Sequence, residues 1–113
     1  MTGDVSRHIG EDAADEFMNA CSDIAEGIIL TCRDDPHVME CRRLGLKDLD
    51  LRVAVAERIS GDIDYATDFL LDRIHDMHVE AGLDPMHPAN REAAAKGASL
   101  RLGIPGLRGA LVG

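Results

Sequence analysis

Acid-x-x-His pairs are the residues of this sequence best suited to metal chemistry. Asp72 and His75 lie three positions apart in a segment with helical periodicity, so both side chains would project from one helical face. Di-iron helical bundles use Glu-x-x-His pairs in this way. Asp34–His37 and Asp84–His87 repeat the spacing beside prolines. Because Asp72 lies opposite the apolar side of its segment, the pattern predicts at most a surface metal site at Asp72 and His75, with the histidines otherwise exposed or at helix ends.

The cysteines and the short motifs give no indication of catalysis. Cys21, Cys32 and Cys41 are odd in number and form no CxxC pair, so we expect reduced thiols that act as small buried hydrophobes. The glycine-flanked serine of hydrolases, the phosphate-binding loop, the dinucleotide glycine pattern and the HExxH zinc motif are missing from the sequence. The sequence therefore favours a binding protein over an enzyme, with no cofactor expected.

Carboxylates recur at every fourth position of the segment 62–81. They are Asp64, Asp68, Asp72, Asp76 and Glu80. In a helix each would lie about 6 Å beyond the last, and each like-charged pair would cost roughly 0.2–0.5 kcal/mol. One interpretation is a solvated face that serves solubility. The other is an acidic binding strip, whose spacing is close to the roughly 7 Å between phosphates of an extended nucleic-acid strand.

Two of the three aromatic residues lie on this same acidic side. Tyr65 and Phe69 are four positions apart, so their rings should touch, and both point away from the apolar seam that includes Leu70. Either a second layer of this chain covers them or another chain does. Aromatic side chains set among polar residues are typical interface anchors. The predicted partner-binding site is therefore the five carboxylates together with Tyr65 and Phe69.

The charge balance restricts the class of partner. The chain has 21 acidic and 12 basic residues, a net charge of −9. Residues 1–92 contain all 21 acids and 9 bases (−12), whereas residues 93–113 contain three bases and no acid (+3). A negative surface repels phosphate backbones, so direct binding to nucleic acid or to anionic membranes is not expected. A protein with a basic surface is the expected partner, and the lean core, which lacks Trp, favours a homodimer.

Apolar periodicity predicts a series of helices. The segment 62–81 is the clearest, and Gly82 marks its end. Its apolar seam repeats at three- and four-residue steps and consists of Ile63, Ala66, Leu70, Ile74, Met77 and Ala81. Asp35 is the predicted N-cap of a short helix from Pro36 to Leu44. Residues 46–60 alternate as a strand would, but their composition favours a helix. Helices are also expected over residues 5–32 and 90–102.

These elements predict an all-α fold. We expect four or five helices with short connections, arranged as a small bundle or as helical hairpins in a single acidic domain over residues 1–113. Gly103, Pro105, Gly106 and Gly109 predict an irregular, apolar tail over residues 103–113.

The tail also resembles a known targeting peptide. Leu102-Gly103-Ile104-Pro105-Gly106-Leu107-Arg108-Gly109 is similar to the C-terminal peptide of encapsulin cargo proteins, which runs Leu-Gly-Ile-Gly-Ser-Leu followed by a basic residue. Pro-Gly replaces Gly-Ser here. The resemblance implies an encapsulated cargo, often ferritin-like or redox-active. The alternative is that the tail packs on its own domain or on a symmetry-related subunit.

The leading expectation is a small acidic helical interaction or regulatory protein. Its most concrete form is an inhibitor that mimics nucleic acid at a basic site of its partner. The alternatives are a metal-binding, ferritin-like helical protein or encapsulated cargo, and a structural subunit of a larger assembly. The sequence has no basic stretch followed by an apolar run at its start and no long apolar segment, so a cytoplasmic location is expected.

Overall fold

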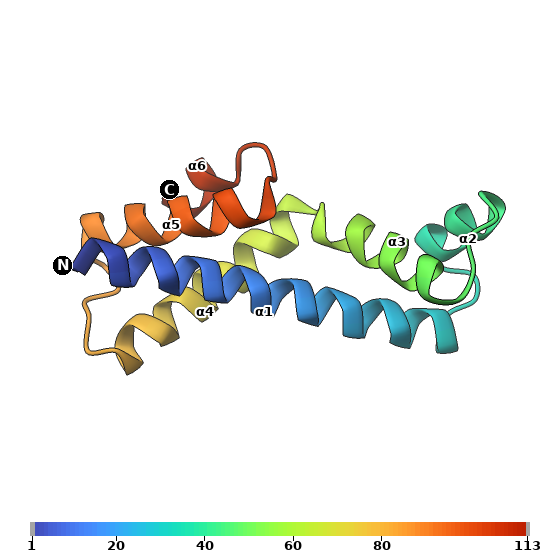
Figure 1. Cartoon of the computed structure of the whole chain (residues 1–113), viewed down its shortest axis with the longest axis horizontal. Coiled ribbons are helices and arrows are strands. Elements are labelled where there is room, and N and C mark those ends of the chain that lie inside the picture. The colour runs from blue at the N-terminus through green and yellow to red at the C-terminus, as the bar shows by residue number, and fades with distance from the viewer. Residues whose placement is uncertain (1, 113) are drawn as a thin grey trace. The chain divides into compact units, whose positions relative to one another are not determined.

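The computed structural model describes residues 2–112, and its regular structure is entirely helical (Figure 1). The helices are α1 (Thr2–Thr31), α2 (Pro36–Arg43), α3 (Asp48–Ser60), α4 (Ile63–Glu80), α5 (Pro88–Leu102) and α6 (Leu107–Val112). No strand occurs in this part of the chain, and the stretch whose alternation allowed a strand forms α3. The all-α prediction is confirmed. None of the described helices is both long and apolar enough to cross a bilayer.

Local interactions explain where several helices begin and end. The Asp35 carboxylate accepts hydrogen bonds from the backbone N–H groups of His37 and Val38, at 2.9 and 3.3 Å, and Pro36 follows it as the first residue of α2. At the end of α4, Gly82 adopts a φ of 75°, and the Leu83 N–H donates to the carbonyl of His78 at 2.9 Å. This is the glycine-terminated C-cap predicted from the sequence.

The helices pack as two compact units. Unit 1 combines the chain up to Phe17 with everything from Ile63 onward, and unit 2 comprises Met18–Asp62. Helix α1 therefore supplies its first half to unit 1 and its second half to unit 2. The expectation of one domain over residues 1–113 stays a prediction.

Unit 2 has a small core of aliphatic and thiol side chains. Its buried residues are Ala25, Val38, Cys41, Leu51 and Val55, from α1, α2 and α3. Arg52 of α3 closes one edge, because its guanidinium donates to Ser22 Oγ at 3.1 Å and lies 3.4 Å from the Glu26 carboxylate. Helices α2 and α3 pack against each other as a hairpin.

Small residues bring α1 and α5 together in unit 1. Ala13, Ala14, Ala94 and Ala98 are buried. A Cβ placed on Gly10 would overlap the carbonyl of Ala94, and one placed on Gly97 would overlap the carbonyl of Arg7. Each glycine therefore allows the backbone of one helix to approach that of the other directly. This close approach fixes how α5 lies on the first half of α1.

The predicted irregular tail is partly helical. Gly103 and Gly106 adopt positive φ angles of 66° and 80°, as expected for turn glycines. Beyond them, α6 packs on α5 and α4, and Leu107 and Leu111 are buried. The expectation of an irregular tail was wrong for residues 107–112, because burial of two leucines four positions apart stabilises a helical turn that the glycine content alone disfavours.

Substitution of Gly10 tests the α1–α5 contact. We expect Gly10→Ala to lower the free energy of unfolding by about 1–3 kcal/mol, since the added methyl group forces two backbones apart. Chemical denaturation monitored by circular dichroism measures this change.

Gly27, also in α1, is the matched control. An added Cβ there meets no atom within 4 Å, so Gly27→Ala should raise the free energy of unfolding by about 0.5–1 kcal/mol through helix propensity alone. Equal effects of the same sign at the two positions would contradict the close packing described here.

Candidate functional site

Helix α4 presents four ridges, each made of residues four apart. One ridge is buried and consists of Ala66, Leu70, Ile74 and His78. Ala66, Leu70 and Ile74 also belong to the apolar seam expected from the sequence. That seam continued with Met77, whereas the buried residue at this point of the helix is His78. The ridge on the opposite side of the helix contains Asp64, Asp68, Asp72, Asp76 and Glu80, all of which are exposed. The carboxylate side chains thus point away from the core along the whole helix.

Tyr65 and Phe69 lie on a third, half-buried ridge that faces α1. Both rings pack against Phe17, with centroid distances of 5.3 and 5.4 Å, and their own centroids are 6.5 Å apart. Edge-to-face contacts of this kind stabilise a core beyond the area they bury. The sequence left two possibilities for what covers these rings, a second layer of the same chain or another chain. The contacts with Phe17 favour the first.

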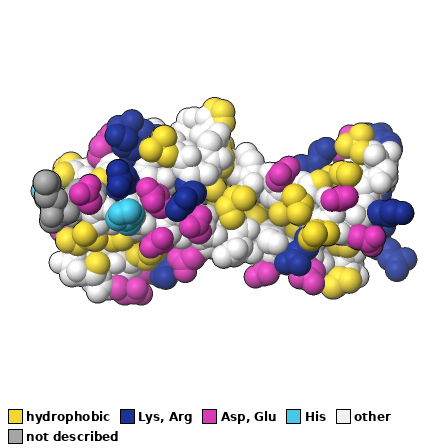
Figure 2. Space-filling view, in the orientation of Figure 1, with side chains coloured by type: hydrophobic (Ala, Val, Ile, Leu, Met, Phe, Trp, Pro, Cys, Tyr) yellow, Lys and Arg dark blue, Asp and Glu magenta, His cyan; other side chains and the backbone are white. Residues whose placement is uncertain are grey.

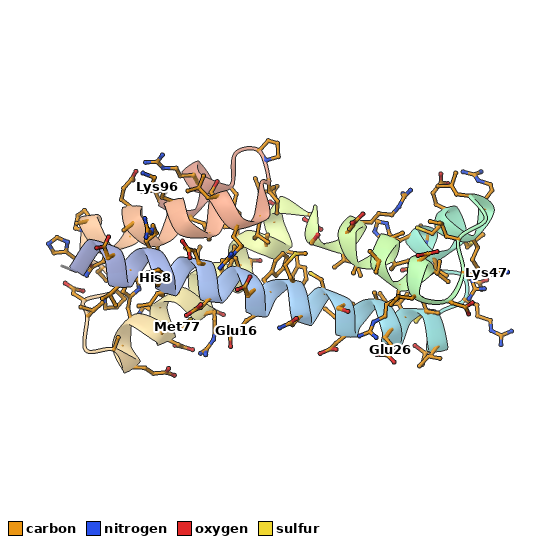
Figure 3. The ribbon with its side chains drawn as sticks, in the orientation of Figure 1. His8, Glu16, Glu26, Lys47, Met77 and Lys96 are labelled. Atoms are coloured by element: carbon orange, nitrogen blue, oxygen red, sulfur yellow. The ribbon has the colours of Figure 1, made fainter. Side chains whose placement is uncertain are left out.

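One arginine neutralises one end of the acidic ridge. The Arg73 guanidinium bonds the Glu16 carboxylate of α1 at 2.7 and 3.3 Å and lies 3.9 Å from Glu80 (Glu16 is labelled in Figure 3). These hydrogen bonds and charges raise the pKa of Arg73. Asp76 lies 3.7 Å from the ring of His75. Within residues 2–112, Asp68 and Asp72 have no ion-pair or hydrogen-bond partner for their carboxylates.

The acids of α1 in unit 1 are arranged differently. Arg101 of α5 lies 3.6 Å from Glu11 and 3.3 Å from Asp15, and Arg7 lies 3.6 Å from Glu11. Figure 2 accordingly shows acidic side chains mixed with basic ones over this half of α1. Glu11, Asp15 and Glu16 of α1 thus have arginine partners, whereas Asp68 and Asp72 of the α4 ridge have none among the described residues.

An apolar hollow lies beside the acidic ridge. Its volume is about 220 Å³, and its lining residues are Leu71, Asp72, Ile74, His75, Pro85, Met86 and Arg91. Leu71 and Met86 are 41% and 63% exposed. The sequence analysis missed this hollow, because it forms only when the segment after α4 folds back along the helix. The available signal was Leu71, an apolar residue outside the predicted seam.

The geometry gives no support for a metal centre at Asp72 and His75. Both side chains are exposed, on neighbouring ridges of α4. Throughout residues 2–112, no group of three or more His, Cys, Asp and Glu side chains is placed to hold a metal ion. A third ligand from the protein is therefore missing from the place where the sequence suggested a surface site.

His78 differs from the exposed or helix-end histidine expected from the sequence. It is fully buried in unit 1. Its Nδ1 lies 2.9 Å from the Ile74 carbonyl, which can only accept a hydrogen bond, so Nδ1 is the donor. Its Nε2 lies 2.9 Å from Ser6 Oγ, and this hydroxyl is 3.3 Å from Asn90 Oδ1. The Asn90 amide donates to the Asp84 carbonyl at 2.9 Å.

This chain of hydrogen bonds links α1, α4 and α5. A serine hydroxyl beside a histidine nitrogen is the geometry of an activated nucleophile. Here, however, the exposed fractions of Ser6 and His78 are both 0%, so no substrate reaches the pair. Its role is to satisfy buried polar groups in a core with few large side chains. Sequence periodicity alone could not place Ser6 next to His78, because the two residues lie 72 positions apart in the chain.

The three cysteines have different environments. Cys21 and Cys41 are buried and Cys32 is exposed, so the expectation of buried thiols was wrong for Cys32. Burial raises the pKa of the Cys21 thiol to about 11. Cys32 follows the last residue of α1, where the helix no longer covers it.

The tail segment makes its contacts within its own unit. Leu107, the second leucine of the segment that resembles the encapsulin cargo peptide, has no exposed surface, and Arg108 pairs with Glu92 of α5. The packing corresponds to the alternative in which the tail folds onto its own domain.

Removal of the Ser6 hydroxyl tests the buried network. Ser6→Ala leaves His78 Nε2 and Asn90 Oδ1 buried without this partner, so we expect a loss of about 1–3 kcal/mol in the free energy of unfolding. Ser60→Ala is the control. It removes an exposed hydroxyl bonded to the Glu57 carbonyl and should change stability by less than about 0.5 kcal/mol. Equal losses for the two variants would contradict the assigned network.

The thiols give a second, independent prediction. At pH 8 a thiol-alkylating reagent should label Cys32 rapidly, and Cys21 and Cys41 only as the chain unfolds, as followed by mass spectrometry of peptides. Rapid labelling of all three would contradict this burial.

The Cys21 thiol should also affect stability at high pH. The unfolded chain releases this proton near the ordinary value of 9.0, whereas the folded chain keeps it to about 11. The unfolded state is therefore favoured as pH rises from 9 to 11, and the free energy of unfolding falls. Cys21→Ala should make this decline less steep.

These residues, and their charges and contacts, are the basis for a functional interpretation. Comparison of the chain with protein-family models, with curated proteins and with solved structures found no match.

Proposed function

We propose that this chain is a protein-interaction module that binds a basic partner through the exposed acidic ridge of α4, Asp64–Glu80. The observation that carries the proposal is the position of this ridge. Its carboxylates lie opposite the buried ridge that holds α4 in place, and those of Asp68 and Asp72 have no partner within residues 2–112. The fold therefore does not depend on these two charges.

The energetics of the ridge support a role outside the fold. Like charges at four-residue spacing cost a helix roughly 0.2–0.5 kcal/mol per pair. Among the described residues, no basic side chain forms an ion pair with Asp68 or Asp72 to offset that cost. Arginines do compensate acids in the same unit, at Glu11, Asp15 and Glu16. A partner with basic side chains would supply the missing compensation and would be attracted over longer distances by the net charge of −9.

We propose a basic protein surface in general as the target. A nucleic-acid mimic is the narrower form of the same proposal, supported by the roughly 6 Å step between carboxylates. Two features favour the general form. Glu80, at one end of the row, already interacts with Arg73, and an apolar hollow adjoins the row at Asp72. A nucleic-acid duplex differs from the α4 row in both respects, because its charged surface is longer and uniform. A homodimer also stays a prediction, measurable by size-exclusion chromatography with light scattering.

Charge reversal on the ridge tests the proposal. The double variant Asp68→Lys, Asp72→Lys should bind a fluorescent oligolysine peptide about ten-fold more weakly than the parent chain, with a smaller dependence on salt, because two carboxylate contacts are replaced by repulsion. Fluorescence anisotropy over a range of NaCl concentrations measures both quantities. Circular dichroism should show unchanged helix content.

A second double variant controls for the change in net charge. Asp34→Lys, Glu57→Lys alters the charge equally at exposed unit 2 positions, and these carboxylates have no ion pair within the described residues. It should change the affinity less than two-fold. If both double variants weaken binding equally, overall charge rather than the α4 ridge is responsible, and the proposal fails.

A further inference from the structure

The hollow beside the acidic ridge has a lining suited to one apolar side chain. Ile74 forms part of its wall at the edge of the core, and Leu71, Pro85 and Met86 surround it. Its volume of about 220 Å³ is below the range of about 300–1,000 Å³ typical of small-molecule pockets. A single aliphatic side chain, supplied by a larger partner, is a better match to this size than a free ligand.

The apolar surface continues along α4. Leu71, His75 and Val79 follow one another at four-residue steps on the ridge next to the carboxylates, and Leu71 and Val79 are 41% and 57% exposed. The exposed apolar side chains of Leu71 and Val79, with His75 between them, therefore form a row beside the acidic one. Water covers both in the free chain. A partner that buries the first would bring its own charges against the second.

The charges around the hollow define the chemistry of this partner. On the α4 side, Asp72 forms the lip, and Asp68 and Asp76 lie one helical turn before and after it. On the other side is Arg91, whose guanidinium donates to the Val112 carbonyl at 3.3 Å and is thereby held in place. Cations of the partner would thus face α4, and polar or acidic groups would face Arg91.

We propose that the hollow and the acidic ridge together bind a basic amphipathic helix of a partner protein. One aliphatic side chain of that helix enters the hollow, and Lys or Arg residues four positions apart contact Asp68, Asp72 and Asp76. Equal four-residue spacing on both helices brings each cation to one carboxylate. Such a helix carries its apolar and basic residues on adjoining faces, which is the common form of helix-in-groove recognition. This inference rests on the proposed function and names its partner class.

Two synthetic helical peptides provide the test. Both are 18 residues long and rich in Ala and Lys, with Lys at four-residue spacing. One has a single Leu beside the Lys row and the other has Ala at that position. The parent chain should bind the Leu peptide about ten-fold more tightly than the Ala peptide, since the leucine side chain leaves water. Fluorescence anisotropy at fixed salt gives both dissociation constants.

Substitutions in the lining of the hollow test whether the preference for the Leu peptide arises there. In the double variant Leu71→Gln, Met86→Gln, the preference for the Leu peptide should fall below two-fold, while the salt dependence of Ala-peptide binding stays unchanged. The control is Met39→Gln, Leu44→Gln, at positions of unit 2 that are 55% and 62% exposed, and it should keep the ten-fold preference. All of these side chains are exposed, so the fold should survive, and circular dichroism checks this.

The outcomes separate the two proposals. If the parent chain binds both peptides equally and with the salt dependence expected of the ridge, no side chain enters the hollow, and this inference fails while the proposed function stands. A preference for the Leu peptide that survives in the Leu71→Gln, Met86→Gln variant would also overturn it. If neither peptide binds the parent chain, the proposed function and this inference both fail.

Discussion

Helix α4 can present a row of exposed carboxylates because its opposite ridge is buried. Ala66, Leu70 and Ile74 pack in the interior of unit 1, and His78 continues the ridge through hydrogen bonds to the Ile74 carbonyl and to Ser6. Burial of apolar surface stabilises the helix by more than the roughly 0.2–0.5 kcal/mol that each like-charged pair costs. Everything proposed for the outer face depends on this one-sided attachment. The polar face is free to serve binding because the core does not need it.

The interior of unit 1 combines close backbone approach with a polar network. Alanines and two glycines bring α1 and α5 together, and such a contact buries little apolar area per residue. Phe17 with Tyr65 and Phe69 supplies the bulk that alanine does not. Ser6, His78 and Asn90 add directional bonds, which specify one arrangement of three helices more strictly than apolar packing does. The sparse aromatic content of the chain is thus concentrated at one place in the core.

Helix positions and the acidic ridge could be predicted from the sequence, because both depend on local spacing. The Asp35-Pro36 start, the Gly82 stop and the four-residue row of carboxylates are features of neighbouring residues. The environment of His78 could not be predicted, since its partner Ser6 is distant in the chain. The same holds for the hollow, which needs the fold of Pro85 and Met86 along α4. The tail was predicted wrongly for the opposite reason, because a local signal was present but did not decide the structure. Burial of Leu107 and Leu111 in the tertiary fold overrode the low helix propensity of a glycine-rich tail.

The division of the chain into units has a consequence for the order of folding. Unit 2 is a continuous stretch of sequence, so its helices can associate as soon as residue 62 has left the ribosome. Unit 1 needs contacts such as Ser6–Asn90, whose residues enclose a loop of more than eighty residues. Closing that loop carries a larger entropic cost, and a folded insert shortens the flexible part of it. During synthesis the apolar side of the first turns of α1 therefore stays uncovered until the residues of α4 and α5 have been made.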